Sequence, residues 1–500
     1  MQKAVVTRLQ AWFITGSRAQ RVAATLALCL LVGVAGGALL AFVKPIYAAA
    51  LLVALAGGLA MLSSTQISFF ALAGVICLLP FAALPGPDIG FTPTVLDVVL
   101  LALLVTWLFR LARRKQPELL VSALGLPVTI FLLLVCASFV MGLSYASLTT
   151  NLLRHFVELL LSIVLFFLVI NNARTQKAVE QIVSVLIVAG LAAALMGIVL
   201  YFLPQDLTIR LLSMLRVFRY PSGSEVLRFI EDNPDLALRA TSTSIDPNVL
   251  GGLLVVITAL TVPQLLTRDP LPLFRLGPRW RGINWLVMPV LSVMLLCLLL
   301  TFSRSALAGL GLAVLIMGLA RYRKLLLFAA LAGLVILLLP QTQGYVQRFL
   351  QGLRGEDLAT QMRFGEYKDA LILIGRHPWF GVGFAGAPDI DVYIGVSNLY
   401  LLIAEETGLV GQAVFVWIVV LALRQIGKGL RRLSGNPTLE AILWGLLGAL
   451  LGVLISGVFD HYFFNINFQH AVALFWFCLG LAMAVTLLPD QAAQPSLHKS

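Results

Sequence analysis

Four arginines of this chain could bind a phosphate-bearing ligand. Arg363 and Arg376 flank a charged segment, Arg304 separates two apolar runs, and Arg154 begins another apolar run. An arginine guanidinium is planar, stays protonated and donates parallel hydrogen bonds to phosphate oxygens. A set of such arginines at a membrane surface would suit a lipid pyrophosphate, whose head group lies at the interface and whose tail lies in the bilayer.

Simpler roles exist for the same arginines. Long loops that cross the membrane escape the usual charge bias, so arginines within them could be merely solvated. Such arginines stand at positions 210, 216, 219, 228, 239, 348, 354, 363 and 376. Arg154 could pair with Glu158 one helical turn later. For Arg154 and Arg304 a role in anion binding is favoured more strongly, because a charge at a membrane boundary needs a partner and usually marks a site.

The segment around Arg363 predicts a helix outside the membrane. Apolar and aromatic residues follow Arg363 at the spacing of one helix face, at positions 367, 370 and 374. Gly375 would end the helix, which would lie along the membrane surface and present Arg363, Glu366 and Tyr367. After His377-Pro378, Gly381 and Gly383 allow a tight bend or a close backbone approach. An ordinary amphipathic helix and turn would explain the same pattern.

The composition predicts an all-α, polytopic transmembrane bundle of about 12–14 spans, forming one integral membrane domain over residues 1–500. Hydrophobic residues make up 60% of the 500 residues and charged residues 12%, whereas soluble domains carry about 25% charged residues. Apolar runs of about 17 residues or more recur throughout, and each is long enough to cross a bilayer. The five cysteines stand in apolar runs without metal-ligand or redox spacing, so we interpret them as packing residues.

Fourteen spans are expected, starting near residues 22, 46, 67, 94, 124, 155, 178, 248, 285, 305, 325, 398, 438 and 471. Five basic clusters then fall on one side, at residues 110–115, 173–177, 275–281, 321–324 and 424–432. Positive loops face the cytoplasm, so this even count places both termini there. The net charge of +12 therefore suggests membrane orientation and not a nucleic-acid partner.

One segment of this topology allows two interpretations, and two of its outer loops are long. Residues 285–320 could form one long helix, but two short spans with Ser303-Arg304-Ser305 at an outer tip keep the basic clusters on one side. Two outer loops are long, at about 204–247 and 340–397, and long loops often carry function.

Four segments in order resemble the O-antigen ligase and O-antigen polymerase superfamily, over residues 150–480. They are SIDPNVLGGLL (244–254), TFSRSAL (301–307), RFGEYKDALILIGRHPWFGVG (363–383) and GVSNLYLLIAEETGLVG (395–411). The resemblance implies a glycosyltransferase in the bacterial cytoplasmic membrane that needs no metal and no cofactor. Its donor would be a glycan on undecaprenyl pyrophosphate, used on the periplasmic or extracellular side. A chain-length regulator or another polysaccharide assembly protein is a possible partner.

The resemblance also suggests roles for residues. Arg304 and Arg363 would stabilise the departing pyrophosphate. Substrate-binding candidates are Arg154, Arg376, Tyr367, Asn398, Asp246 and Asn248. A polymerase of repeat units and a ligase to another acceptor both remain open, and a lipid-linked glycan transporter is the alternative of another class.

One position departs from the family pattern. The ligases have a histidine thought to activate the acceptor where this chain has Ser397, and serine is no base at neutral pH. This departure favours the polymerase. Because a general base contributes about 10²–10⁴-fold, another residue should take the role. Candidates are His377 and Asp391, which we take as catalytic candidates, and also Asp389, Glu405, Glu406, Asp460 and His461.

Overall fold

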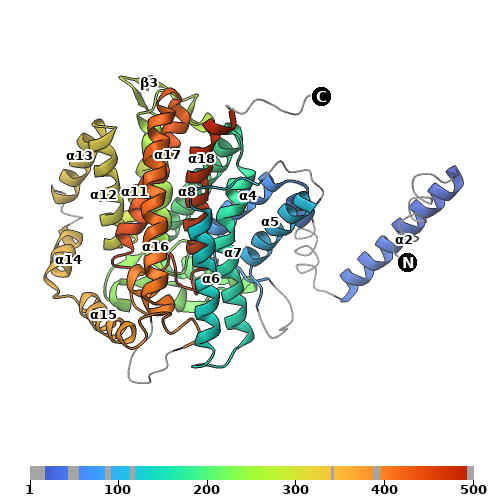
Figure 1. Ribbon diagram of the computed structural model, residues 1–500, viewed down its shortest axis with the longest axis horizontal. Coiled ribbons are helices and arrows are strands. Elements are labelled where there is room, and N and C mark those ends of the chain that lie inside the picture. Colours follow the sequence, from blue (N-terminus) through green and yellow to red (C-terminus); the bar gives the residue numbers. More distant parts are fainter. Residues whose placement is uncertain are drawn as a thin grey trace. The chain divides into compact units, whose positions relative to one another are not determined.

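The computed structural model describes residues 17–42, 56–84, 92–112, 119–338, 343–386 and 395–492. The chain divides into two compact units, Met1–Ala60 and Met61–Ser500. The first unit contains helix α2 (Arg18–Phe42), and the second contains every other element named below (Figure 1). The single membrane domain expected over residues 1–500 stays a prediction.

The second unit is built almost entirely of helices. They are α4 (Thr65–Leu78), α5 (Val95–Ala112), α6 (Gly125–Gly142), α7 (Thr150–Asn172), α8 (Gln176–Phe202), α9 (Gln205–Ser213), α10 (Pro247–Thr261), α11 (Val287–Leu300), α12 (Arg304–Ala320), α13 (Lys324–Leu338), α14 (Gln343–Arg354), α15 (Leu358–Arg376), α16 (Leu399–Arg432), α17 (Pro437–Ser456) and α18 (Gln469–Ala492). Two small antiparallel hairpins pair β1 (Arg228–Phe229) with β2 (Leu238–Arg239) and β3 (Arg279–Trp280) with β4 (Ile283–Asn284).

The predicted all-α polytopic bundle is confirmed. Within the described residues eight helices are long and apolar enough to cross a membrane, and α4, α11, α12 and α13 are shorter apolar helices. Each expected span start falls within a few residues of a helix start, except the start near residue 46, which lies outside the described residues. Helices α10 and α18 are almost wholly buried, while α5 and α16 leave most of their surface exposed, as lipid-facing helices do.

The choice between one helix and two over residues 285–320 is settled by a break. Helix α11 ends at Leu300 and α12 begins at Arg304. Between them Phe302 has a φ of 53°, a left-handed conformation that a helix cannot contain. The two-helix prediction is confirmed, and Arg304 is the first residue of α12.

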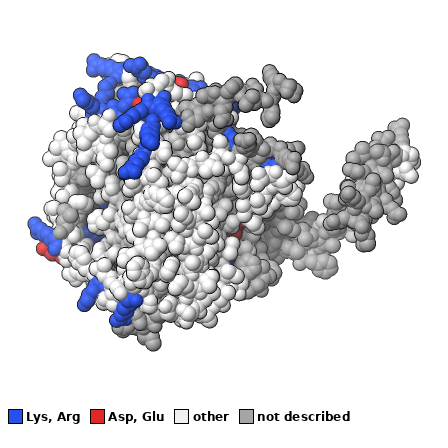
Figure 2. All heavy atoms as spheres, in the orientation of Figure 1, with Lys and Arg blue, Asp and Glu red and all other residues white. Residues whose placement is uncertain are grey.

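The basic clusters gather at one end of the second unit, which we call the basic end. Hydrogen bonds and ion pairs connect residues in or beside these clusters. The pairs are Arg110 with Thr65, Gln66 with Gln181, Gln176 with Asn436, Arg275 with Glu180, and Arg321 with Glu440. Figure 2 shows Lys and Arg concentrated at the end that carries β3, with smaller groups at the opposite end. The side of the membrane that each end faces, and the position of the termini, stay predictions.

Helix α16 is broken inside its apolar length. Gly408 has φ 72° and ψ 177°, and the loop after α15 fills the break. The amides of Val382 and Gly383 donate to the carbonyls of Glu405 and Glu406, at 2.8 and 3.0 Å. In return the Leu409 amide donates to the Pro378 carbonyl at 2.7 Å. The two glycine-bearing segments that follow each other in the sequence therefore form one backbone junction.

Candidate active site

Helix α15 has the side-chain arrangement expected from its sequence. Ala370 and Ile374 are buried against the bundle, and Arg363, Glu366 and Tyr367 are half-buried. The helix ends at Arg376, with His377 as its C-cap. The predicted C-cap at Gly375 is therefore wrong by two residues, because Gly375 and Arg376 remain helical and the turn begins at the residue before Pro378.

Arg304 and Arg363 line one cavity of about 280 Å³ at the end opposite the basic end, and we call it the arginine cavity. Its other polar lining residues are Glu231, Asp232, Arg239, Asn248, Ser305, Gln351 and Asp357. The two arginines come from separate sequence segments, α12 and α15. They converge at one end of the bundle, in a pocket whose lining also includes Arg239 and three carboxyl residues.

Asp357 holds Arg304 in place. The Arg304 Nη2 and Asp357 Oδ2 atoms are 2.6 Å apart, and Asp357 is the N-cap residue of α15. Burial raises the pKa of Asp357, but hydrogen bonds from Arg304 and Thr360 outweigh burial and hold it below its usual value. Asp357 is therefore an anion at neutral pH, and a phosphate would have to replace it at Arg304.

Asp460 is the carboxyl partner of Arg363, in a longer ion pair without a hydrogen bond. It is buried in the connection between α17 and α18, with Oδ1 3.8 Å from Nη2 of Arg363. The Ser305 hydroxyl donates to its other oxygen. Burial raises the pKa of Asp460, although Arg363 and Ser305 oppose this shift. One carboxyl group thus links α12, α15 and the α17–α18 connection.

His461 follows Asp460 in the chain and retains a free ring nitrogen. Its Nδ1 is buried and has no hydrogen-bond partner within the part of the chain that the structure describes. Burial lowers its pKa, against the charges of Asp460, Glu366 and Asp246. A neutral imidazole with an unused nitrogen can accept a proton.

The position of Ser397 is tied to α15 through its backbone. The Ser397 amide donates to Oε2 of Glu366 at 2.9 Å, and its carbonyl accepts from the Tyr367 hydroxyl at 3.2 Å. Asn398 caps α16 and also donates to the Val458 carbonyl at 2.8 Å. Tyr367 and Asn398 therefore join α15, α16 and the α17–α18 connection next to Arg363.

The DPN segment lies beside the same cavity. The Asp246 side chain caps α10 by accepting from the amides of Asn248 and Val249. Asn248 lines the cavity and accepts from Nη2 of Arg239 at 2.7 Å. Arg239 also donates to the Thr301 carbonyl, which links the first long loop to the α11–α12 break. Asp246 has a helix-capping role, and Asn248 lines the arginine cavity.

Arg154 belongs to another polar cluster, on α5 and α7. Its Nη1 lies 3.1 Å from Oδ2 of Asp97 and 3.0 Å from Oε2 of Glu158. The pairing with Glu158 matches the simpler alternative in the sequence. Arg154 does not line the arginine cavity, although its neighbour His155 contacts the Ile466 carbonyl in the α17–α18 connection.

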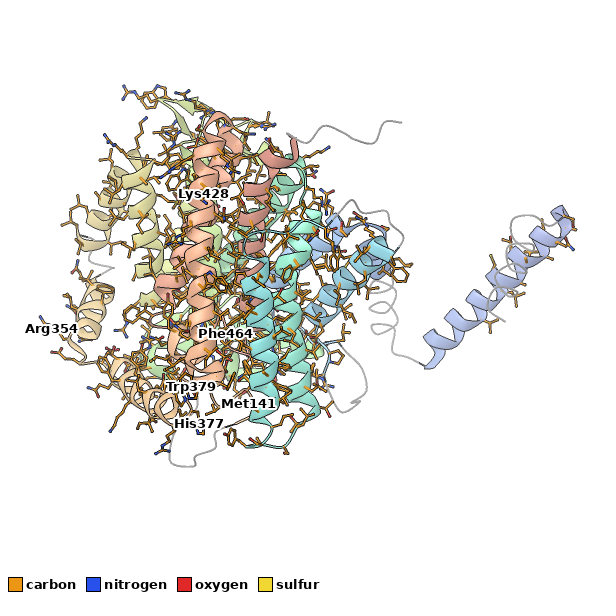
Figure 3. The ribbon with its side chains drawn as sticks, in the orientation of Figure 1. Met141, Arg354, His377, Trp379, Lys428 and Phe464 are labelled. Carbon is orange, nitrogen blue, oxygen red and sulfur yellow. The ribbon has the colours of Figure 1, made fainter. Side chains whose placement is uncertain are left out.

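Two further candidates are not assembled with Arg304 and Arg363. Arg376 and His377 lie at the far end of α15 from Arg363, where His377 packs edge-on against Tyr145. In Figure 3 His377 and Trp379 appear next to Met141 on α6. Asp391 and Asp389 lie outside the described residues. Among the described residues no group of three His, Cys, Asp or Glu side chains could hold a metal ion.

Sequence reasoning missed Asp357. It stands 53 residues after its partner Arg304, and no periodicity connects them. The signal available was its position before a helix, where aspartate is a preferred N-cap.

Comparison with known proteins agrees with the resemblance seen in the sequence. No curated protein matches the chain. A family model described as O-antigen ligase matches residues 289–416. This range contains Arg304, Arg363, Ser397 and the backbone junction between the loop after α15 and Gly408. The match supports the predicted place of the chain in the O-antigen ligase superfamily.

Proposed function

We propose that this protein is a membrane glycosyltransferase that uses a glycan carried on undecaprenyl pyrophosphate, and that it polymerises repeat units of a surface polysaccharide. The family match supports an O-antigen ligase-like, glycan-processing function. The observation that carries the finer proposal is the arginine cavity. Arg304 and Arg363, from two family-like segments, line the same pocket at one end of an apolar bundle.

The two arginines suit the leaving group. When the bond between the anomeric carbon and the pyrophosphate oxygen breaks, the electron pair stays on that oxygen. Fixed guanidinium groups stabilise such charge, and removal of one donor of this kind costs about 10²–10³-fold in rate. In the resting protein Asp357 and Asp460 take the place of the phosphate oxygens at Arg304 and Arg363. The apolar walls of the bundle would accept the lipid tail.

The acceptor hydroxyl forms the new bond to the anomeric carbon and must lose its proton. We assign this proton to His461, because its Nδ1 is buried and unused and because it follows the carboxylate that holds Arg363. Asp460 is less suited, since Arg363 and Ser305 occupy its two oxygens. His377 lies at the far end of α15, and Ser397 offers only its backbone.

The length of lipid-linked glycan in cells that lack the gene separates the possible reactions. A polymerase predicts accumulation of single repeat units on undecaprenyl pyrophosphate. Accumulation of long polymer on the lipid would instead identify a ligase. Retention of the glycan lipid on the cytoplasmic leaflet would identify a transporter, and unchanged pools would refute the substrate.

Site variants test the arginine cavity. Arg304→Gln and Arg363→Gln should each reduce transfer by about 100-fold or more, with folded protein at wild-type amounts. The matched control is Arg354→Gln, because Arg354 is exposed on α14, outside the cavity lining (Figure 3). Equal activity in all three variants would refute the assignment of both arginines.

A further inference from the structure

A second cavity lies at the basic end. Its volume is about 550 Å³, within the range of about 300–1,000 Å³ that is usual for ligand pockets. Three connections line it: the segment after α10, the α12–α13 turn and the start of α17, together with the β3–β4 hairpin. We call it the basic cavity. It shares no lining residue with the arginine cavity.

The charges in the basic cavity are unbalanced. Of the described residues that line it, five are cations and one is a carboxylate: Arg268, Arg279, Arg321, Arg323, Lys324 and Glu440. Glu440 is committed to Arg321, with Oε1 2.6 Å from its Nε. The nearby Asp269 is also engaged, by Arg275 and by the Thr438 hydroxyl. Four cations therefore share the cavity without a matching anion among the described residues.

Two of these cations are fixed by neutral groups. Arg279 donates to the carbonyls of Thr267 and Arg268, and Lys324 donates to the carbonyl of Arg281 at 2.7 Å. Such bonds orient the side chains without cancelling their charge. Arg268 and Arg323 are exposed and have no ion pair within the described ranges. Like charges held together repel one another, so an anion that enters the cavity gains from all four.

The surroundings point to a lipid as the source of that anion. Trp280 and Trp285, on and just after the β3–β4 hairpin, are 58% and 42% exposed. Tryptophans in this situation mark the membrane–water interface. Helix α13, which begins at the cavity, presents Leu327 and Leu331 outward. A phospholipid whose phosphate lies in the cavity could therefore place its acyl chains along α13.

We propose that the basic cavity binds the phosphate head group of an anionic phospholipid, and that Arg268 and Arg323 supply its free cationic ligands. Basic pockets between helices are a known way to hold such head groups. The cavity lies at the opposite end from the arginine cavity, so this lipid is distinct from a glycosyl donor. Figure 2 shows the density of basic side chains around this end.

The test uses purified full-length protein and a short-chain phosphatidylglycerol below its micelle concentration, with thermal stability as the readout. The wild type should show saturable stabilisation, and short-chain phosphatidylcholine should give none. The double variant Arg268→Gln/Arg323→Gln should raise the half-saturating concentration by roughly 30-fold, about fivefold for each basic residue. Neither side chain forms an ion pair or a hydrogen bond among the described residues, so the variant should fold.

The control variant removes the same charge from the same end. Arg424 and Lys428 are exposed on α16 and do not line the cavity. Figure 3 labels Lys428 on this helix. Arg424→Gln/Lys428→Gln should leave the half-saturating concentration within about twofold. An equal loss in both double variants would show a general surface charge and overturn the site. Inorganic phosphate at matched ionic strength should not compete, and competition at similar concentrations would overturn the lipid as the source.

Discussion

Replacement of Gly408 by alanine adds only one methyl group, but we expect it to destabilise the protein strongly. The Gly408 dihedral angles, φ 72° and ψ 177°, lie in a region that is essentially limited to glycine, where other residues cost about 1–3 kcal/mol. An added Cβ would also lie 2.2 Å from the Trp379 carbonyl oxygen and 2.5 Å from the Phe380 nitrogen. Both contacts are with backbone, which cannot rotate away.

The junction would have to open to admit the methyl group. Opening would stretch the hydrogen bonds of Val382, Gly383 and Leu409 across the two segments. Each hydrogen bond contributes about 0.5–1.5 kcal/mol, so loss of two adds about 1–3 kcal/mol. Together with the backbone term, Gly408→Ala should lower the free energy of unfolding by about 2–6 kcal/mol.

The measurement is denaturant-induced unfolding of the detergent-solubilised protein, with Gly427→Ala as the matched control. Gly427 lies on the same helix, has ordinary helical geometry, and nothing lies within 4 Å of its would-be Cβ. Its replacement should leave stability unchanged or raise it by up to about 1 kcal/mol. If Gly408→Ala unfolds like the control, the junction does not stabilise the fold. Wild-type stability with lost transfer would instead assign these glycines to close approach of the substrate.

Three further outcomes are expected. The free energies of unfolding of Arg304→Gln, Asp357→Asn and the double variant should give a coupling free energy of about 1–2 kcal/mol between the two side chains, since their ion pair is charge-assisted and only partly exposed. Additive effects of the two substitutions would contradict an interaction between them. Ser397→Ala should keep transfer within about threefold, because the backbone of Ser397 makes its contacts; a loss of about 100-fold would make this serine catalytic. Burial lowers the pKa of His461 in the folded state, so below about pH 6.5 the unfolded chain binds more protons and stability falls with acid. The melting temperature of His461→Gln should therefore fall less than that of the wild type between pH 7.5 and 5.5, and equal falls would contradict the shift.

The helices were predictable because each is a local pattern. Apolar runs place α10, α17 and α18 within a few residues of their observed starts, and the basic clusters identify one end. The face of α15 followed from a spacing of three and four residues. Its C-cap was predicted two residues too early, at Gly375 in place of His377, because a glycine inside a helix and a glycine after it look the same in the sequence.

The site was only partly predictable because its contacts join distant segments. Arg304 and Asn248 stood out by their positions at span boundaries, and Arg363 by its place on a predicted surface helix. The structure places all three on one cavity. Asp357 and Asp460, which hold the arginines, carry no spacing that links them to their partners. The glycines at 381 and 383 suggested close approach to something bulky, and the fold shows that Gly381 approaches the backbone of α16 beside its break while Gly383 approaches the backbone of α6.

The arginines of the two cavities differ in whether they have carboxylate partners, and this difference affects how tightly each cavity would hold an anion. In the arginine cavity Arg304 and Arg363 each have a carboxylate partner, Asp357 or Asp460. A pyrophosphate must displace these partners, so the net gain is small and the product can leave after each transfer, as turnover requires. In the basic cavity Arg268 and Arg323 have no such competitor among the described residues, so an anion gains their full attraction and stays bound. We therefore expect an anionic lipid at the basic end to dissociate more slowly than the glycosyl donor at the arginine cavity.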